Sequence, residues 1–268
     1  MMEIQMSDPK PITSVESHDT IVALLEGEPR GRLLDVPCGR GALGIRLARM
    51  DFEVHYCDID AGLFELKAEK LAIVNLNTDR LPYPDGHFDY ITCTNGLHRL
   101  YNSKMAICEF ARCLAENGKL FISYPNYASL WRRIMFLLYG SLGQGVDRPA
   151  FLQVTKDPDA HFRCALTVPQ ILNTLEEFGF NNTQLFKART EKLNWIALPL
   201  GVFIKIFTYV CSNQHVIRYR LREVNSADVL FGSREVFIRA SRVNSGQRKD
   251  GAQLQRRAMT RRSYDQKK

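Results

Sequence analysis

Two aspartates and a group of glycines form the most informative pattern in the chain. Asp35 ends an apolar run and precedes the glycine-rich turn Cys38–Gly44, and Asp58 ends the next apolar run. Glycines allow a backbone to approach a ligand closely, and a helix that starts after the turn presents free N–H groups. A carboxylate at Asp35 repels a pyrophosphate but suits a cation, whereas Asp58 can accept hydrogen bonds from ribose hydroxyls. The pattern indicates a site for a cationic ligand that contains a nucleoside.

A dinucleotide site remains open as an alternative. Gly39, Gly41 and Gly44 match the spacing GxGxxG, which by itself suggests NAD. Asp58 suits either ligand, because a carboxylate at the tip of the second strand binds ribose in both kinds of site. An NAD-dependent oxidoreductase is therefore one hypothesis for this chain.

Two longer runs carry a family resemblance. Leu33–Gly44 resembles the first motif of class I S-adenosylmethionine-dependent methyltransferases, with Pro37 in place of the commoner glycine. Asn75–Tyr90 is similar to the third motif of that family, with Asn77 where Asp is usual, and an amide there can still bond the adenine amino group. Pro125-Asn126 together with His161–Thr167 looks like the type 11, MetW-like and ubiquinone-type branch.

The resemblance covers residues 32–240 and implies S-adenosyl-L-methionine as cofactor. The sequence shows no cluster of carboxylates with spacing suited to Mg²⁺, so we expect no metal. The residues that the resemblance implies for cofactor binding are Asp35, Pro37, Gly39, Gly41, Asp58, Ile59, Leu76, Asn77 and Asn95. His98 and His161 are the catalytic candidates, because a neutral imidazole can take a proton from an acceptor hydroxyl as it is methylated.

Short apolar runs alternate with amphipathic stretches of helical length, which predicts a sheet with helices on its faces. The expected strands are Arg32–Val36, Glu53–Cys57, Ala72–Leu76, Phe88–Thr94, Lys119–Tyr124, Thr183–Ala188 and Glu235–Ala240. The expected helices are His18–Glu26, Ala42–Met50, Ala61–Lys70, Lys104–Ala115 and Pro169–Phe178. The resemblance implies an α/β, doubly wound, Rossmann-like sheet of seven strands in the order 3-2-1-4-5-7-6, the last strand antiparallel.

Two insertions, 127–166 and 190–232, are too long for plain loops, and we expect a helical cap from them over the site. The apolar runs Ser129–Tyr139 and Trp195–Cys211 lie in these insertions, and Pro199 and Gly201 argue against one straight helix in the second. Three placements are open for the two runs: packing on the sheet, lining an acceptor pocket, or lying on a membrane surface. Residues 16–242 then form the methyltransferase domain, between a loose segment 1–15 and a basic, disordered tail 243–268.

Composition excludes several other classes of protein. The chain has 268 residues, 45% of them hydrophobic, and no run of 18 uncharged apolar residues, so we expect no membrane-spanning helix. Its seven cysteines are scattered without a CxxC pair, which favours reduced thiols, and the first residues show no secretory signal, so we expect a cytoplasmic protein. The net charge of +7 comes mostly from residues 243–268, which carry eight Lys or Arg and two Asp.

The resulting hypothesis is methyl transfer to a small molecule, most simply at oxygen, with a hydrophobic or lipid-linked acceptor suggested by the apolar insertions. We expect no nucleic-acid partner, although a nucleic-acid methyltransferase that uses the basic tail remains a rival. A second rival is a non-catalytic, MetW-like partner protein of another enzyme, and a protein partner therefore stays open.

Overall fold

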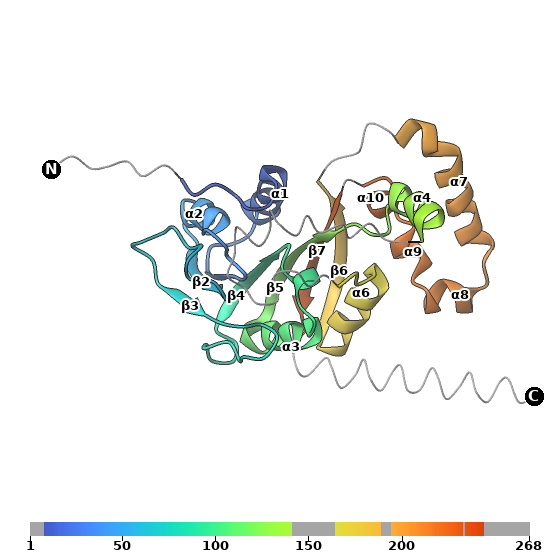
Figure 1. Ribbon diagram of the computed structural model, residues 1–268. Helices are drawn as coiled ribbons and strands as arrows, with labels where there is room; N and C mark the ends of the chain where they lie inside the picture. Colours follow the sequence, from blue (N-terminus) through green and yellow to red (C-terminus); the bar gives the residue numbers. More distant parts are fainter. Residues whose placement is uncertain (1–7, 141–163, 189–193, 233, 244–268) are drawn as a thin grey trace, which may run out of the picture.

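The computed structural model describes residues 8–140, 164–188, 194–232 and 234–243, which are built around one seven-stranded sheet (Figure 1). The strand order is β3-β2-β1-β4-β5-β7-β6, and β7 is antiparallel to both of its neighbours. The expected fold class is therefore confirmed. The strands are β1 (Arg32–Asp35), β2 (Glu53–Asp58), β3 (Leu71–Ile73), β4 (Phe88–Thr94), β5 (Leu114–Pro125), β6 (Phe180–Lys187) and β7 (Glu235–Arg242).

Helices cover both faces of this sheet, as a doubly wound fold requires (Figure 1). Strand side chains alternate between the faces, so that Leu33 packs in one core and Leu34 in the other. The first core is closed by α1 (Val15–Glu26) and α2 (Ala42–Ala48), and the second by α3 (Ser103–Cys113) and α6 (Val168–Glu177). A short 3-10 helix, η1 (Leu97–Arg99), follows β4.

The described parts of the two insertions form helices at one end of the molecule (Figure 1). These cap helices are α4 (Leu130–Tyr139), α7 (Asn194–Val210), α8 (Asn213–Arg218), α9 (Leu221–Val224) and α10 (Ala227–Leu230). Pro199 and Gly201, which argue against one straight helix, lie within α7, which continues through both. Pro199 lies in the second turn, where its ring removes one backbone hydrogen bond and crowds the preceding turn, and Gly201 gives α7 the room to pack against the Phe231 ring.

The helix expected over Ala61–Lys70 does not form, and this segment consists of turns. Its side chains instead fold back over the glycine turn: Phe64 packs against Tyr56 with ring centroids 5.2 Å apart, and Glu65 pairs with Arg40 at 2.9 Å. These tertiary contacts outweigh the helical propensity of the segment. The segment thereby closes one side of the turn that follows β1.

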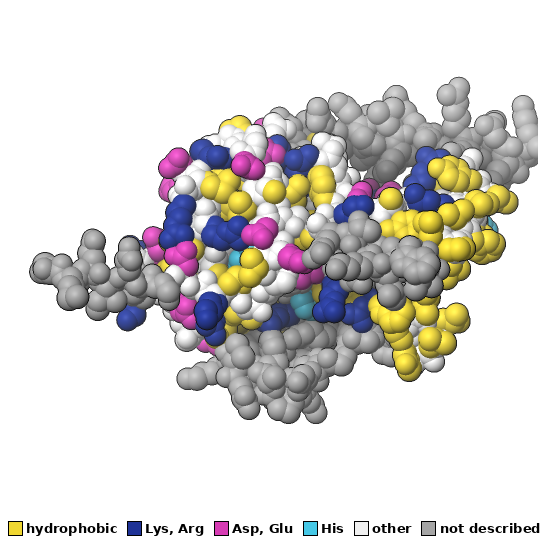
Figure 2. All heavy atoms as spheres, turned by 90° about the horizontal axis from the view of Figure 1, so that it is seen from above, with side chains coloured by type: hydrophobic (Ala, Val, Ile, Leu, Met, Phe, Trp, Pro, Cys, Tyr) yellow, Lys and Arg dark blue, Asp and Glu magenta, His cyan; other side chains and the backbone are white. Residues whose placement is uncertain are grey.

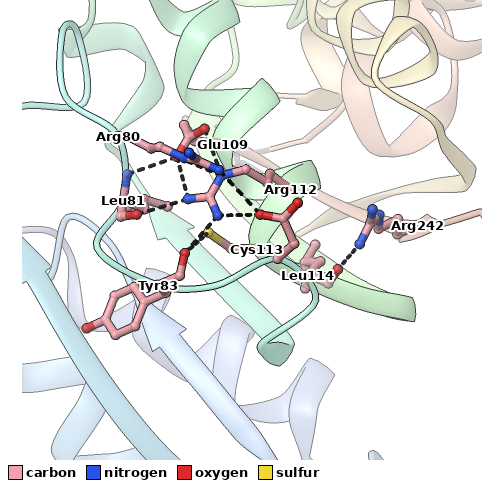
Figure 3. Close-up of polar contacts among 9 residues, drawn as sticks. Arg80, Leu81, Tyr83, Glu109, Arg112, Cys113, Leu114 and Arg242 are labelled. Carbon is pink, nitrogen blue, oxygen red and sulfur yellow. Dashed lines mark hydrogen bonds and ion pairs between the residues drawn. The ribbon is translucent and has the colours of Figure 1, made fainter.

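Arg112 on α3 fixes the segment that leads into β4 (Figure 3). Its guanidinium donates to the carbonyl oxygens of Leu81 at 2.9 Å and Tyr83 at 2.7 Å, and it pairs with Glu109 at 2.7 Å. Glu109 also accepts from the Leu81 amide at 2.9 Å. The Arg112 and Glu109 side chains are only 14% and 12% exposed, and their mutual hydrogen bonds raise the pKa of Arg112. Arg112 and Glu109 therefore both stay charged although their side chains are largely buried.

This pair predicts a stability effect. Replacing Arg112 with Ala removes the positive charge that pairs with the Glu109 carboxylate and leaves two backbone carbonyls without this donor, and we expect the free energy of unfolding to fall by about 3 kcal/mol. Urea denaturation measures the change. Arg80→Ala is the matched control, because the Arg80 side chain is 68% exposed and its loss should leave the midpoint near the wild-type value. Adding Glu109→Gln to Arg112→Ala should recover part of the loss, and an unchanged midpoint in Arg112→Ala would contradict the role of the pair.

Candidate functional site

A cavity of about 330 Å³ opens at the carboxyl ends of β1, β2 and β4. This is where open α/β sheets bind their ligands. Most of the residues proposed from the sequence line it, namely Asp35, Pro37, Gly39, Asp58, Ile59, Leu76, Asn77, Asn95 and His98. Gly41 lies just beyond the lining as the N-cap of α2, and His161 falls outside the described residues. The structure therefore brings nearly the whole proposed set into one place.

The glycine turn between β1 and α2 has a backbone conformation that residues with a Cβ atom rarely adopt. Gly39 and Gly41 have φ angles of 53° and 82°, in the left-handed region that favours glycine. A Cβ atom on Gly41 would lie 2.6 Å from Cδ1 of Leu66, because the 61–70 segment covers the turn there. The turn can therefore keep its shape only with glycine at these positions.

Asp58 ties the turn to the end of β2. Its carboxylate accepts from the Gly39 amide at 2.7 Å and from the Asp60 amide at 3.1 Å. Burial raises the pKa of Asp58, while the two N–H groups and the charge of Arg99 oppose the rise. The residue is 6% exposed and lines the cavity, so its remaining lone pairs are available to hydroxyl donors of a ligand.

Asp35 presents a second carboxylate to the same cavity. It is 1% exposed, and its Oδ1 accepts from the Thr92 hydroxyl at 2.9 Å. Among the described residues, Oδ2 has no hydrogen-bond partner. Burial raises the pKa of Asp35 to about 7, with the charge of Asp58 adding to the rise. An unsatisfied buried carboxylate beside a second one favours a ligand that brings positive charge and disfavours a pyrophosphate.

Asn77 lies elsewhere on the cavity wall. It is 5% exposed, and its side-chain oxygen accepts from the Asn102 amide at 3.1 Å. An amide oxygen carries two lone pairs, so one remains for a ligand amino group. Val74, Leu76 and Ile59 line the cavity as apolar neighbours that suit the faces of a planar ring.

Sequence reasoning missed several polar groups of the cavity, among them Arg40 and Arg99 as well as Glu235 and His18. Glu235, the first residue of β7, accepts from Asn95 at 2.8 Å and from Ser17 at 2.6 Å. His18 of α1 bonds Thr13 at 3.1 Å, and burial lowers its pKa to about 4, so it is neutral at physiological pH. Glu235 and His18 come from elements remote in sequence from the motifs. The sequence offered one signal for Glu235, namely that it is a charged residue at the start of an expected strand, and none for His18.

His98 lies in η1 and lines the cavity, with its ring 6.1 Å from that of Tyr124 in an edge-to-face arrangement. Cys38 also lines the cavity, but burial raises the pKa of its thiol far above the ordinary value. A protonated thiol is a poor nucleophile. Of these two groups, the histidine is the candidate base, because a neutral imidazole carries a nitrogen lone pair that can accept a proton.

Residues 8–14, which the sequence assigned to a loose leading segment, lie against the domain. Asp8 forms a two-bond ion pair with Arg49, with both distances 2.6 Å. Ile12 and Thr13 contribute to the cavity wall. The leading segment therefore helps to shape the site.

Comparison with known proteins matches residues 16–185, more than half of the chain, to the family model described as "Methyltransferase domain". The ubiquinone/menaquinone biosynthesis C-methyltransferase UbiE of Shewanella pealeana is 30% identical over 145 residues, which are 50% of this chain and 57% of that protein. The demethylmenaquinone methyltransferase of Beutenbergia cavernae is 29% identical over 143 residues, 51% of this chain and 58% of that protein. The chain thus matches less than two thirds of the length of these relatives.

Among solved structures, a SAM-dependent methyltransferase from Archaeoglobus fulgidus superposes with a TM-score of 0.54. The two sequences are 16% identical, and the superposition covers 84% of this chain and 94% of the Archaeoglobus protein. At this identity the similarity concerns the fold, and the fold it shares is the sheet described above.

The buried Asp35 carboxylate predicts a pH-dependent stability. Between the ordinary pKa of 3.8 and about 7, the folded protein keeps a proton that the unfolded chain has lost. The free energy of unfolding should therefore fall as pH rises through this range, by up to about 1.4 kcal/mol per pH unit. Asp35→Asn should flatten the dependence, measured by urea denaturation of protein dialysed free of small ligands. The exposed Asp51→Asn serves as control, and an identical slope in Asp35→Asn would refute the assignment.

Proposed function

Because the chain belongs to the class I S-adenosylmethionine-dependent methyltransferases, we propose that it transfers a methyl group to a small hydrophobic acceptor. The observation that carries the proposal is the Asp35 carboxylate, which is buried in the cavity with an unsatisfied oxygen. This group disfavours a dinucleotide and suits the cationic S-adenosyl-L-methionine. An NAD-dependent oxidoreductase is therefore not proposed.

The residues of the cavity fit this cofactor. Asp35 would face its cationic amino-acid part, and Asp58 would accept hydrogen bonds from its ribose hydroxyls. Asn77 would bond the adenine amino group, with Ile59 and Leu76 against the apolar faces of the ring. Pro37, Gly39, Gly41 and Asn95 would shape the remaining wall.

When bound, S-adenosyl-L-methionine supplies an electrophilic methyl group. The contribution of the protein is to hold the acceptor in line and to accept its proton, and alignment of this kind can contribute about 7–11 kcal/mol to lowering the barrier. His98 is the proposed base among the described residues, since it lines the cavity and a neutral imidazole can accept a proton. His161 remains the second candidate.

We propose oxygen as the atom that accepts the methyl group. The names of the relatives make carbon the alternative acceptor atom. Their names describe C-methylation in quinone biosynthesis and demethylmenaquinone methylation. Removing a proton from a phenol or enol hydroxyl makes both the oxygen and the conjugated ring carbon more nucleophilic, so one base serves either product. NMR of the methylated product distinguishes them, because a methyl on oxygen and a methyl on carbon have well-separated chemical shifts.

Cofactor binding should depend on the turn and on Asp58. Gly39→Val places a branched side chain on a left-handed backbone at the cavity wall, and we expect binding to be abolished. Asp58→Ala removes the ribose acceptor and the partner of the Gly39 amide, and should weaken binding by about 1–3 kcal/mol. Calorimetry with S-adenosyl-L-methionine measures both. Asp19→Ala, an exposed residue outside the cavity lining, is the control; wild-type affinity in both cavity variants would remove the cofactor assignment.

Turnover should depend on His98 separately from binding. If His98 accepts the proton, His98→Ala lowers turnover by about 10²–10⁴-fold while cofactor affinity stays near wild type. The assay incubates the protein with methyl-labelled donor and fractionated cell extract. Label in a small-molecule or lipid fraction supports the enzyme, whereas no transfer with any fraction, together with a protein retained in a pull-down, favours the non-catalytic rival. A His98→Ala variant within about tenfold of wild type would leave catalysis to alignment alone.

A further inference from the structure

The cap exposes an unusual amount of apolar surface. Of the nineteen exposed large hydrophobic side chains in the described part of the chain, fifteen lie on α4, α7 and α8 or at the C-cap of α8. Figure 2 shows hydrophobic side chains gathered over this end of the molecule. Soluble monomers rarely expose contiguous apolar patches larger than a few hundred Å². We call the outer surface of α4, α7 and α8 the cap face.

Helix α7 has its apolar side turned away from the protein. Its inner side holds Gly201 against Phe231, and Thr208, which accepts from Asn225 of the neighbouring turn at 2.7 Å. Its outer side includes Phe203, 64% exposed, and Tyr209, 88% exposed. A helix on the surface of a soluble protein shows the opposite arrangement. The apolar side of α7 is therefore left for something outside the described structure.

Helix α4 continues the same surface. It packs beside α7 and is anchored by Arg133, which donates to the carbonyl oxygens of Ala128 at 2.8 Å and Val224 at 2.9 Å. Its outer end presents Leu137 at 83% exposure and Tyr139 at 74%. These bonds tie α4 to the end of α9, and α4 lies in contact with α7, so that the outward side chains of α4 and α7 form one face.

The charge on the cap face has a single sign. Within their described bounds, α4, α7 and α8 contain no Asp or Glu, while Arg132 and Arg218 supply positive charge and the partly buried Lys205 adds to it from the inner side of α7. Figure 2 shows Lys and Arg side chains along the border of the apolar area. Aromatic rings beside Lys and Arg are typical of helices that lie at a membrane interface. Positive charge without carboxylates is complementary to a lipid surface of negative charge.

We propose that the cap face binds the surface of a bilayer containing anionic lipid, with α4 and α7 lying in the interface. Among the helices that the structure describes, none has the length and hydropathy needed to cross a bilayer. The proposal goes beyond methyl transfer and does not depend on it, because binding to vesicles requires neither cofactor nor acceptor.

The experiment uses the full chain and co-sedimentation with vesicles. The vesicles are phosphatidylcholine alone or phosphatidylcholine with about 30% phosphatidylglycerol. The wild type should sediment with the mixed vesicles and more weakly with phosphatidylcholine, and added salt should reduce binding. The triple variant Leu137→Ser, Phe203→Ser, Tyr209→Ser should lose more than about tenfold in partitioning, because it removes three exposed side chains from the cap face.

The matched control is Ile73→Ser with Tyr101→Ser, which removes exposed apolar side chains that lie outside the cap. It should bind vesicles as the wild type does. Unchanged thermal unfolding and cofactor affinity in the triple variant show that it is folded. Absence of wild-type binding to both vesicles, or equal binding by the triple variant, would overturn the proposal. Sedimentation of the wild type as a dimer that the triple variant dissociates, without vesicle binding, would assign the face to a second copy of the chain.

Discussion

The hydrogen bond from the Gly39 amide to the Asp58 carboxylate joins the glycine turn after β1 to the end of β2. It positions one carboxylate in the cavity next to another, that of Asp35, and both are buried. Burial raises the pKa of Asp35 and the charge of Asp58 adds to the rise, so ionising both acids in this space carries an electrostatic cost. A ligand that brings positive charge and hydroxyl groups relieves that cost, and a ligand rich in phosphate increases it.

The cavity has two halves of different origin. The half with Asp35, Asp58 and Asn77 is formed by loops that follow consecutive strands. The other half receives Glu235 from β7 and His18 from α1, and the Asn95–Glu235–Ser17 hydrogen bonds hold these elements together. A division of this kind lets one half serve a cofactor common to a family while the other varies with the acceptor. The cap, at one end of the sheet, adds a surface whose chemistry suits lipid.

The sequence predicted what depends on local pattern. Strand β4 was expected at Phe88–Thr94 and occurs there, because it is a central strand with apolar side chains on both faces. The helix expected over 61–70 failed because contacts with Tyr56 and Arg40 across the turn outweigh local propensity. Glu235 and His18 could not be placed in the site, since only the topology brings β7 and α1 to it. The sequence could not predict the outward orientation of α7 for the same reason. The helix is apolar along its length, and this does not indicate which of its sides packs against the rest of the protein.

The cation preference of the cavity is the claim on which the functional assignment rests. Calorimetric titration of the wild type with S-adenosyl-L-methionine and, separately, with NAD tests it most directly. Two buried carboxylates predict saturable binding of S-adenosyl-L-methionine that strengthens as pH rises past about 7 and Asp35 ionises, with no measurable binding of NAD. Tight binding of NAD, or S-adenosyl-L-methionine binding that weakens over the same pH range, would contradict it.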